Sequence, residues 1–363
     1  MPNRKLNFVF IGLSLSSSWG NGHATTYRGL LRELSSLGHA VHFLECDQKW
    51  YRENRDLKEP EYCCLHIYSD LSELKNLYAE LVENADIVVV GSYVVAGCAV
   101  GEWVQKIASG ITAFYDIDTP VTLRLLEKDK CPYLSRELIE GYQYYFSFSF
   151  GPVLERIEAE YGARCVLPLL CSVDPEIYQP KSIEQKFELG YLGTYSRDRQ
   201  GSLENFLIGA AKRLPGREFV VAGPQYPARN EWPDNVQYYD HICPMQHSEF
   251  YCSQRFTLNL TRSDMRALGY SPSVRIFEAA ACGVPIISDV WPGLSELFRI
   301  DQEIFITSSV EQTVMILRET SEEARARVAA NARKRVLESH TARTRACELE
   351  RYAIEALRLR EAA

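Results

Sequence analysis

An arginine and a glutamate three residues apart, Arg275 and Glu278, stand near the start of a segment with a helical pattern. An arginine in a first helical turn faces the positive end of the helix dipole, which costs roughly a few tenths of a kcal/mol unless an anion lies there. Free backbone amides together with Ser271, Ser273 and Arg275 make a plausible seat for a diphosphate. Glu278, one turn further on, could accept hydrogen bonds from a ribose diol. The alternative is an exposed ion pair on a surface helix.

Capping and helix-breaking residues set the expected limits of this helix within the run SPSVRIFEAAACGVPIISD, 271–289. Ser271 suits the N-cap, Pro272 fits the first turn and Gly283 ends the helix, after which an apolar strand follows. Asn259 and Arg262, at and after the end of the preceding predicted strand, could supply a further polar contact and a further cation.

Acid–base chemistry has three candidate residues in the first half of the chain. His23 follows a Gly-Asn-Gly run at a predicted helix start, and its imidazole could act as a general base for an attacking hydroxyl. Asp116 and Asp118 are two residues apart at a strand end, so both side chains could point the same way. The alternatives are a capping or packing role for His23 and an Asx turn ahead of Pro120 for the aspartates.

The cysteines and histidines lack the spacing that is usual in metal and redox sites. The eleven cysteines contain no C-x-x-C pair, and the chain fits a reducing, cytoplasmic setting. No zinc ribbon and no thioredoxin-type redox site is therefore expected. The histidines other than His23 show no metal-ligand spacing either: His39, His42, His66, His241, His247 and His340.

Composition narrows the partners. Lys+Arg 40 against Asp+Glu 48 gives a formal charge of −8, which argues against nucleic acid as the partner. Hydrophobic residues at 46% are typical of a folded globular chain. The longest internal apolar stretch, 87–101, is interrupted by glycines and is too short to span a bilayer, so no integral membrane segment is expected.

Apolar runs separated by helical patterns predict two tandem α/β units. Strands are expected at 6–13, 40–45, 86–91 and 111–115, and again at 187–193, 218–222, 256–260 and 284–289. Continuous apolar strands of this kind form parallel sheets that are covered on both faces. Ligands of such sheets bind at the carboxyl ends of the strands, so a cleft is expected there.

The run RIFEAAACGVPIISD resembles the donor-binding helix of GT-B glycosyltransferases, E-A-x-A-x-G-x-P-V/I. It resembles more closely the CgeB-like, spore-maturation-type branch, in which an arginine precedes "FE" and a W-x-G-L segment follows, here WPGL at 291–294. LGYLGTYSRDRQ at the start of the second unit and VDPEIYQP between the units extend the match over most of 1–300. Tyr270 stands where many retaining enzymes of this fold carry a second glutamate, so the stereochemistry stays open.

The resemblance implies two Rossmann-like domains whose parallel sheets face a central cleft. An acceptor domain would span 1–170 and a nucleotide-sugar donor domain 171–340, with a C-terminal helix over 341–363 that could cross back to the first domain. The activity implied is metal-independent glycosyl transfer, with no bound cofactor, from a UDP-, GDP- or dTDP-linked sugar to a small-molecule, glycan or protein acceptor. The loop that would face the donor phosphates holds Gly193, Thr194, Tyr195, Arg197 and Arg199.

Two other functions remain open from the residues. The same fold could serve a nucleotide-sugar epimerase or a nucleotide-sugar binder without catalysis. A dinucleotide-dependent oxidoreductase is the other, because GNGHAT at 20–25 holds two glycines of a dinucleotide fingerprint and Glu45 lies where a ribose-binding acid belongs. Thr25 replaces the third glycine of that fingerprint.

Overall fold

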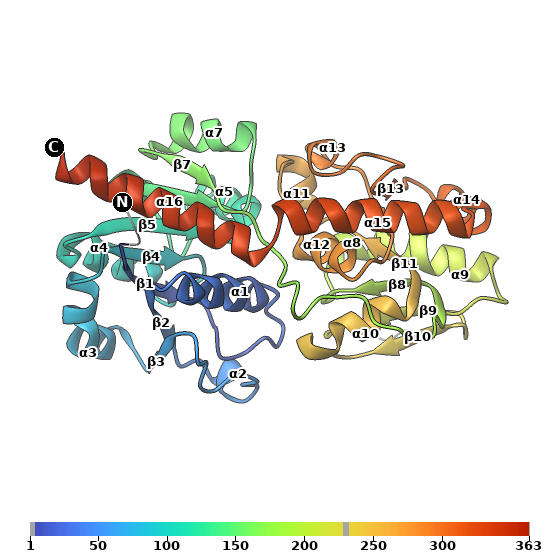
Figure 1. The fold of residues 1–363 in the computed structure, drawn as a ribbon, viewed down its shortest axis with the longest axis horizontal. Coiled ribbons are helices and arrows are strands. Elements are labelled where there is room, and N and C mark those ends of the chain that lie inside the picture. The colour runs from blue at the N-terminus through green and yellow to red at the C-terminus, as the bar shows by residue number, and fades with distance from the viewer. Residues whose placement is uncertain (1–3, 228–231, 363) are drawn as a thin grey trace. The chain divides into compact units, whose positions relative to one another are not determined.

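A computed structural model describes residues 4–227 and 232–362 of the chain. The chain divides into two compact units, the first made of Met1–Cys171 with Ala342–Ala363 and the second of Ser172–Thr341 (Figure 1). Both have a parallel sheet packed with helices, as the apolar strand pattern predicts, and the α/β fold class is confirmed. In the described residues no helix is both long and apolar enough to cross a membrane.

The first unit is built on a seven-stranded parallel sheet with the order β3-β2-β1-β4-β5-β6-β7. Successive residues in its centre, such as Val88, Val89 and Val90, are all buried, so both faces of the sheet are covered. The strands are β1 (Asn7–Gly12), β2 (Ala40–Cys46), β3 (Cys64–Tyr68), β4 (Ile87–Gly91), β5 (Ile111–Asp116), β6 (Tyr144–Ser147) and β7 (Val166–Pro168).

Eight helices belong to the described part of the first unit. They are α1 (His23–Ser36), α2 (Lys49–Arg52), α3 (Leu71–Glu83), α4 (Gly97–Ile107), α5 (Thr119–Leu126), α6 (Arg136–Gly141), α7 (Pro152–Tyr161) and α16 (Ala342–Glu361). The C-terminal α16 lies beside α1 and buries Ala346, Leu349 and Ala353 (Figure 1). The twenty residues of α16 therefore complete the core of the first unit, although they follow the second unit in sequence.

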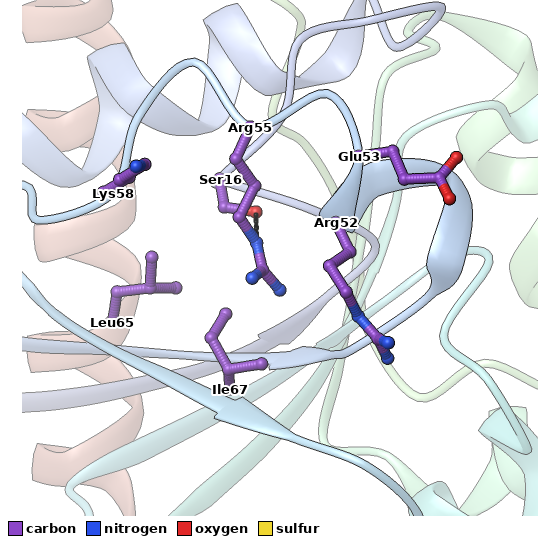
Figure 2. A pocket seen from close by; sticks show the side chains of 7 residues that line it. All are labelled: Ser16, Arg52, Glu53, Arg55, Lys58, Leu65 and Ile67. Atoms are coloured by element: carbon purple, nitrogen blue, oxygen red, sulfur yellow. Dashed lines mark hydrogen bonds between the residues drawn. The ribbon is translucent and has the colours of Figure 1, made fainter.

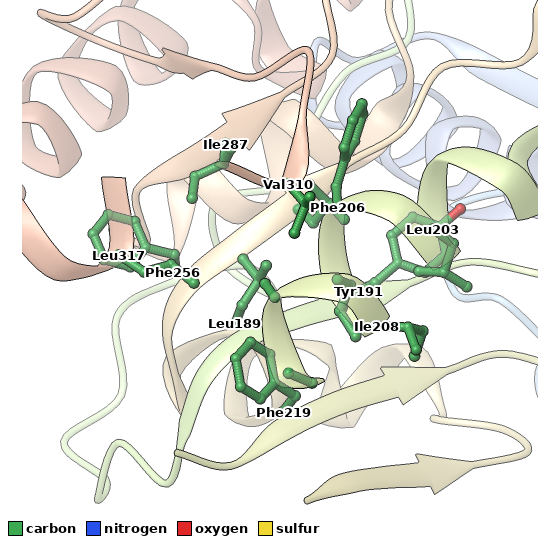
Figure 3. Packing of buried hydrophobic residues seen from close by; sticks show 14 of the residues in the cluster. Leu189, Tyr191, Leu203, Phe206, Ile208, Phe219, Phe256, Ile287, Val310 and Leu317 are labelled. Carbon is green, nitrogen blue, oxygen red and sulfur yellow. The ribbon is translucent and has the colours of Figure 1, made fainter. Parts of the chain in front are cut away.

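The second unit has a six-stranded parallel sheet with the order β10-β9-β8-β11-β12-β13. Leu189, Phe219 and Phe256 from three neighbouring strands pack with Leu207 and Leu317 from the helices to form its core (Figure 3). The strands are β8 (Phe187–Leu192), β9 (Phe219–Ala222), β10 (Val236–Tyr239), β11 (Gln254–Asn259), β12 (Ile286–Ser288) and β13 (Phe305–Ile306).

Its helices begin with a continuous helical run over 197–213. This run is α8 (Arg197–Leu203), a π-helical turn η1 (Glu204–Ile208) and α9 (Gly209–Arg213). The others are η2 (Pro244–Gln246), α10 (His247–Cys252), α11 (Ser263–Leu268), α12 (Val274–Ala281), α13 (Leu294–Leu297), α14 (Val310–Glu319) and α15 (Glu322–Ser339). The helices α15 and α16 are separated by His340 and Thr341.

Each sheet has one point where the strand order reverses. In the first unit the chain builds outward from β1 through β2 to β3 and then returns to place β4 on the other side of β1. In the second it builds from β8 through β9 to β10 and returns to place β11 beside β8. Loops that follow the strands on either side of such a switch point separate, and ligands of open α/β sheets bind there. The loops after β1, β4, β8 and β11 are therefore the places to look for function.

Candidate functional site

Arg275 joins the ends of β8 and β11 at the switch point of the second unit. Its Nε donates a hydrogen bond to the carbonyl oxygen of Leu192, at 2.5 Å, and its Nη1 donates to Oδ1 of Asn259, at 2.9 Å. The guanidinium carbon lies 4.8 Å from the ring centroid of Tyr191, and only 8% of the residue is exposed. These contacts hold the cation in one orientation, so a ligand that meets it pays little ordering entropy.

The third guanidinium nitrogen, Nη2, borders the space beside Gly193. A methyl group built on Gly193 would come within 2.7 Å of this nitrogen and 2.8 Å of the Tyr191 hydroxyl. The absence of a side chain at Gly193 therefore lets the fixed cation approach the backbone after β8 closely. A guanidinium fixed at the end of a parallel strand favours a phosphate group.

The helix that carries Arg275 starts later than the sequence predicts. α12 begins at Val274 with Ser273 as its N-cap, because Ser273 has an extended backbone with φ −86° and ψ 146°. The prediction of Ser271 as N-cap and Pro272 in the first turn is wrong; the Ser271 hydroxyl donates to the carbonyl of Gly269 instead, at 3.1 Å. Arg275 is consequently the second helical residue, close to the positive end of the helix.

Asn259 organises this helix start. Its Oδ1 accepts hydrogen bonds from the Ser273 hydroxyl at 2.8 Å and from Arg275 at 2.9 Å, and its amide nitrogen donates to Oγ of Ser288 at 2.9 Å. The residue is 1% exposed, so it orients the arginine rather than presenting its own side chain. Asn259, Ser273 and Arg275 are thereby brought together as expected.

Glu278 lies deep in the second unit. It is 4% exposed, and its Oε2 accepts a hydrogen bond from the Tyr251 hydroxyl at 2.9 Å. Burial and the Glu278 charge both raise the pKa of Tyr251, which keeps that hydroxyl a donor. The alternative of an exposed Arg275–Glu278 pair on a surface helix is wrong, because α12 is buried from Arg275 to Ala281.

The loop after β8 also brings its predicted residues together. Arg199 donates from Nη2 to the carbonyl of Thr194 at 2.7 Å, and the Tyr195 ring meets the Tyr226 ring edge-on with centroids 5.6 Å apart. Arg197 is the exposed first residue of α8. Arg199 therefore fastens the loop, while Arg197 points a cation outward.

Sequence reasoning missed Asp198, which fastens this loop to α11. Its Oδ2 accepts from the backbone amide of Ser263 at 2.7 Å and from the Ser263 hydroxyl at 3.0 Å. Arg262 is the N-cap residue of α11, so Asp198 sets the position of Arg262 as well. The sequence shows an acidic residue in the loop after β8, but it does not show its partner, which is 65 residues away.

We expect the Asp198 link to fail in acid. Burial alone would raise the pKa of Asp198, but hydrogen bonds from Ser196 and Ser263 together lower it to about 2. Because the folded-state pKa lies below the ordinary value of 3.8, the link is fully present above pH 4 and is lost as the pH falls towards 2.

Amide hydrogen exchange at Ser263 measures this link. Its protection should hold from pH 7 to about pH 4 and then decline, and Asp198→Asn should lower it already at pH 7. Asp234→Asn, at an exposed position of the same unit, is the control. Unchanged Ser263 exchange in Asp198→Asn would show that the carboxylate does not hold α11.

In the first unit, His23 lies near the switch-point loop that follows β4. His23 is the first residue of α1, and its ring stacks on Tyr93 with centroids 6.5 Å apart and lies 5.8 Å from the Phe148 ring. The Tyr93 hydroxyl donates to Oδ2 of Asp118 at 2.7 Å. Tyr93 thus connects the predicted base with one of the two predicted acids.

Tyr93 itself was missed from the sequence. Its backbone has φ 65°, a left-handed conformation that non-glycine residues rarely adopt. Strain of this kind persists where the surroundings enforce it and concentrates at functional sites. Burial and the neighbouring Asp118 charge raise the pKa of Tyr93, so its hydroxyl stays protonated as a donor.

Asp116 and Asp118 have different hydrogen-bond partners. Asp116 is fully buried, and its carboxylate accepts from Ser92 at 2.8 Å, from Thr122 at 2.6 Å and from Tyr145 at 2.5 Å. Burial raises its pKa. Its Oδ1 also accepts from the Asp118 amide at 3.3 Å, which is the Asx turn left open above. Asp116 therefore organises the end of β5 from inside the unit, and its role in proton transfer stays a prediction.

Glu45 removes the basis of the oxidoreductase alternative. Its carboxylate is fully buried and accepts hydrogen bonds from the amides of Leu15 and Ser16, at 2.7 and 2.9 Å, and from the hydroxyls of Ser14 and Ser16. The carboxylate that would bind a ribose in a dinucleotide site thus accepts its hydrogen bonds from the loop after β1. Within residues 4–227 and 232–362, no group of three or more metal-ligating side chains comes together.

Comparison with known proteins shows the fold and a glycosyltransferase-like region. Residues 199–351 match a family model described as glycosyl transferase-like, and no curated protein sequence matches the chain. Among solved structures, a sucrose-phosphate synthase from Thermosynechococcus elongatus has a TM-score of 0.72 at 13% identity, over 99% of this chain and 100% of that chain. The chain therefore has the GT-B glycosyltransferase fold, with a glycosyltransferase-like region that contains α12.

Two further structures share the fold and were solved with nucleotides. HepE of Anabaena, in complex with UDP and glucose, has a TM-score of 0.71 at 12% identity, over 96% of this chain and 100% of that chain. An alpha-glucosyltransferase in complex with UDP-glucose and DNA has a TM-score of 0.72 at 15% identity, over 97% and 100%. The expected GT-B fold is confirmed.

Proposed function

We propose that this protein is a glycosyltransferase that takes a sugar from a UDP-linked donor bound by its second unit. The observation that carries the proposal is Arg275, a buried cation fixed between the ends of β8 and β11 and close to Gly193. UDP is the nucleotide proposed because similar structures were solved with UDP or UDP-glucose.

In this mechanism the C1–O bond of the donor breaks while negative charge grows on the leaving diphosphate. Arg275 and the amides at the start of α12 lie where they would stabilise that charge, and their fixed geometry avoids reorganisation during the reaction. Arg197 and Arg262 are further cations near the same strand ends. These groups can do the work of a divalent ion, so we propose that transfer is metal-independent and needs no cofactor.

Three finer assignments belong to the same proposal. The run RIFEAAACGVP together with WPGL supports a CgeB-like subfamily. All eleven cysteines are free thiols, which suits a cytoplasmic setting. The acceptor is proposed to be a small molecule, glycan or protein rather than nucleic acid, given the formal charge of −8.

Thermal stabilisation by nucleotides tests the proposal directly. A ligand that binds the folded state at ten times its Kd stabilises it by about 1.4 kcal/mol. We expect UDP to raise the Tm in the presence of EDTA, and GDP, dTDP and NADH at equal concentration to raise it less. A shift with NADH but with no nucleoside diphosphate would contradict the proposal, and a shift with UDP only after Mg²⁺ is added would contradict metal independence.

A further inference from the structure

A pocket in the first unit is lined by three cations and lies outside the groups discussed so far. Its volume is about 520 Å³, and Arg52, Arg55 and Lys58 line it together with Ser16 and Glu53 (Figure 2). Leu65 and Ile67 from β3 form an apolar wall. A volume in this range holds a ligand the size of a substituted sugar.

Arg55 is fixed inside this pocket before any ligand arrives. Its Nε donates to the Ser16 hydroxyl oxygen at 3.2 Å, and its Nη2 donates to Oδ1 of Asp47 at 2.7 Å. Asp47 also holds Arg52, through Nε at 3.0 Å. A planar guanidinium held in this way binds oxyanions with little loss of freedom.

Of the residues that line the pocket, three are cations and one, Glu53, is an acid. Asp47 is shared by two arginines, and Glu53 is 3.9 Å from Lys49, a lysine on the same short helix. In Figure 2 the Glu53 carboxylate is directed away from Arg55 and Lys58. Lys58 lies on the other side of Arg55 and is exposed. An anion between Arg55 and Lys58 would therefore face two cations.

The pocket is connected to His23 by one hydrogen-bonded loop. The Ser16 hydroxyl, which accepts from Arg55, donates to the buried carboxylate of Glu45 at 2.6 Å. Asn21 closes the same loop: its Nδ2 donates to the carbonyl of Ser14 at 3.3 Å, and its Oδ1 accepts from the amide of His23 at 3.1 Å. A molecule anchored in the pocket would thus bind to the same loop that positions the candidate base.

We propose that this pocket binds a phosphate monoester and that the acceptor of the transfer reaction carries such a group. The first part stands on Ser16, Arg52, Arg55 and Lys58 alone, and the second part rests on the proposed function. The phosphate oxygens accept from Arg55 and Lys58, and the apolar wall of Leu65 and Ile67 covers the carbon skeleton. Arg52 lies at the rim and favours the approach of the dianion.

Calorimetric titration of the full chain with glucose 6-phosphate tests the pocket, with glucose as the neutral probe and glucuronate as the carboxylate probe. We expect glucose 6-phosphate to bind, glucose to show no binding, and glucuronate to bind more weakly. Arg55→Gln should weaken glucose 6-phosphate about 10-fold or more, and Lys58→Gln at the rim should weaken it less. Arg156→Gln, a partly exposed arginine of the same unit, should have no effect.

UDP binding measured on the same samples separates the two proposals. If Arg55→Gln binds glucose 6-phosphate as tightly as the parent does, the phosphate-site proposal is wrong. If Arg55→Gln does not fold, the same conclusion follows from equal affinities of the parent and Lys58→Gln. Tighter binding of glucuronate overturns the assignment to phosphate. Normal UDP binding without glucose 6-phosphate binding contradicts the phosphate site but not the proposed glycosyltransferase function. Glucose 6-phosphate binding without UDP binding supports the phosphate site and contradicts its role in binding the acceptor.

Discussion

Replacing Arg275 with alanine should weaken UDP binding by about 10- to 100-fold, because loss of a charge-assisted hydrogen-bond partner costs roughly 1.5–3 kcal/mol. The substitution should also lower the stability of the second unit. The buried Asn259 would lose one donor to its Oδ1, and the carbonyl of Leu192 would lose the donor from Arg275. The two effects are read separately, by calorimetric titration with UDP and by unfolding without ligand.

Arg275→Lys and Arg333→Ala are the informative companions. Lysine keeps the charge but cannot reach Leu192, Asn259 and the space beside Gly193 at once, so its UDP affinity should lie between those of the parent and the alanine variant. Arg333 donates from Nε to the carbonyl of Ala281 at the other end of α12, at 3.1 Å. Arg333→Ala therefore perturbs the same helix away from Gly193 and should leave UDP affinity unchanged. Parental UDP affinity in folded Arg275→Ala would remove the phosphate role from this residue.

The central strands of both sheets could be predicted because their residues are apolar on both faces. IVVV in β4 and FVVA in β9 have no other plausible location than a covered sheet. The strands that were missed at the edges have a different character. β3, CLHIY, and β10, VQYY, are only half-buried and mix polar with apolar residues, so they lack the continuous apolar run that marks the central strands.

The site residues were located by the strand ends they follow, but their roles depend on partners far away in sequence. Arg275 binds a carbonyl 83 residues away, and Glu278 binds a tyrosine 27 residues away. A helical wheel of α12 suggests an exposed flank because it contains no information about which elements surround the helix. The same limit explains Glu45, whose partners lie about 30 residues earlier in the loop after β1.

The acceptor side is where the largest loss of turnover is expected. His23→Ala should lower the rate of sugar transfer by about 10²- to 10⁴-fold if His23 deprotonates the attacking hydroxyl, the usual range for a general base. Its UDP affinity should stay near that of the parent, because Arg275 and the loop after β8 belong to the other unit. Tyr93→Phe, which removes the hydrogen bond to Asp118 but keeps the ring against His23, should lower the rate less.

Single-turnover transfer from UDP-glucose to dilute methanol tests this role, because the methyl glucoside formed keeps its anomeric configuration for NMR. A base is required when the configuration inverts, whereas in a retaining reaction the departing diphosphate can accept the proton itself. His23 is the base if the product is inverted, the His23→Ala variant transfers slowly and the His241→Ala control transfers at the parental rate. Asp118→Asn should follow Tyr93→Phe, since both alter the same hydrogen bond. Asp116→Asn should instead lower stability, because three donors converge on its buried carboxylate. An inverted product formed at the parental rate by His23→Ala would take His23 out of the mechanism.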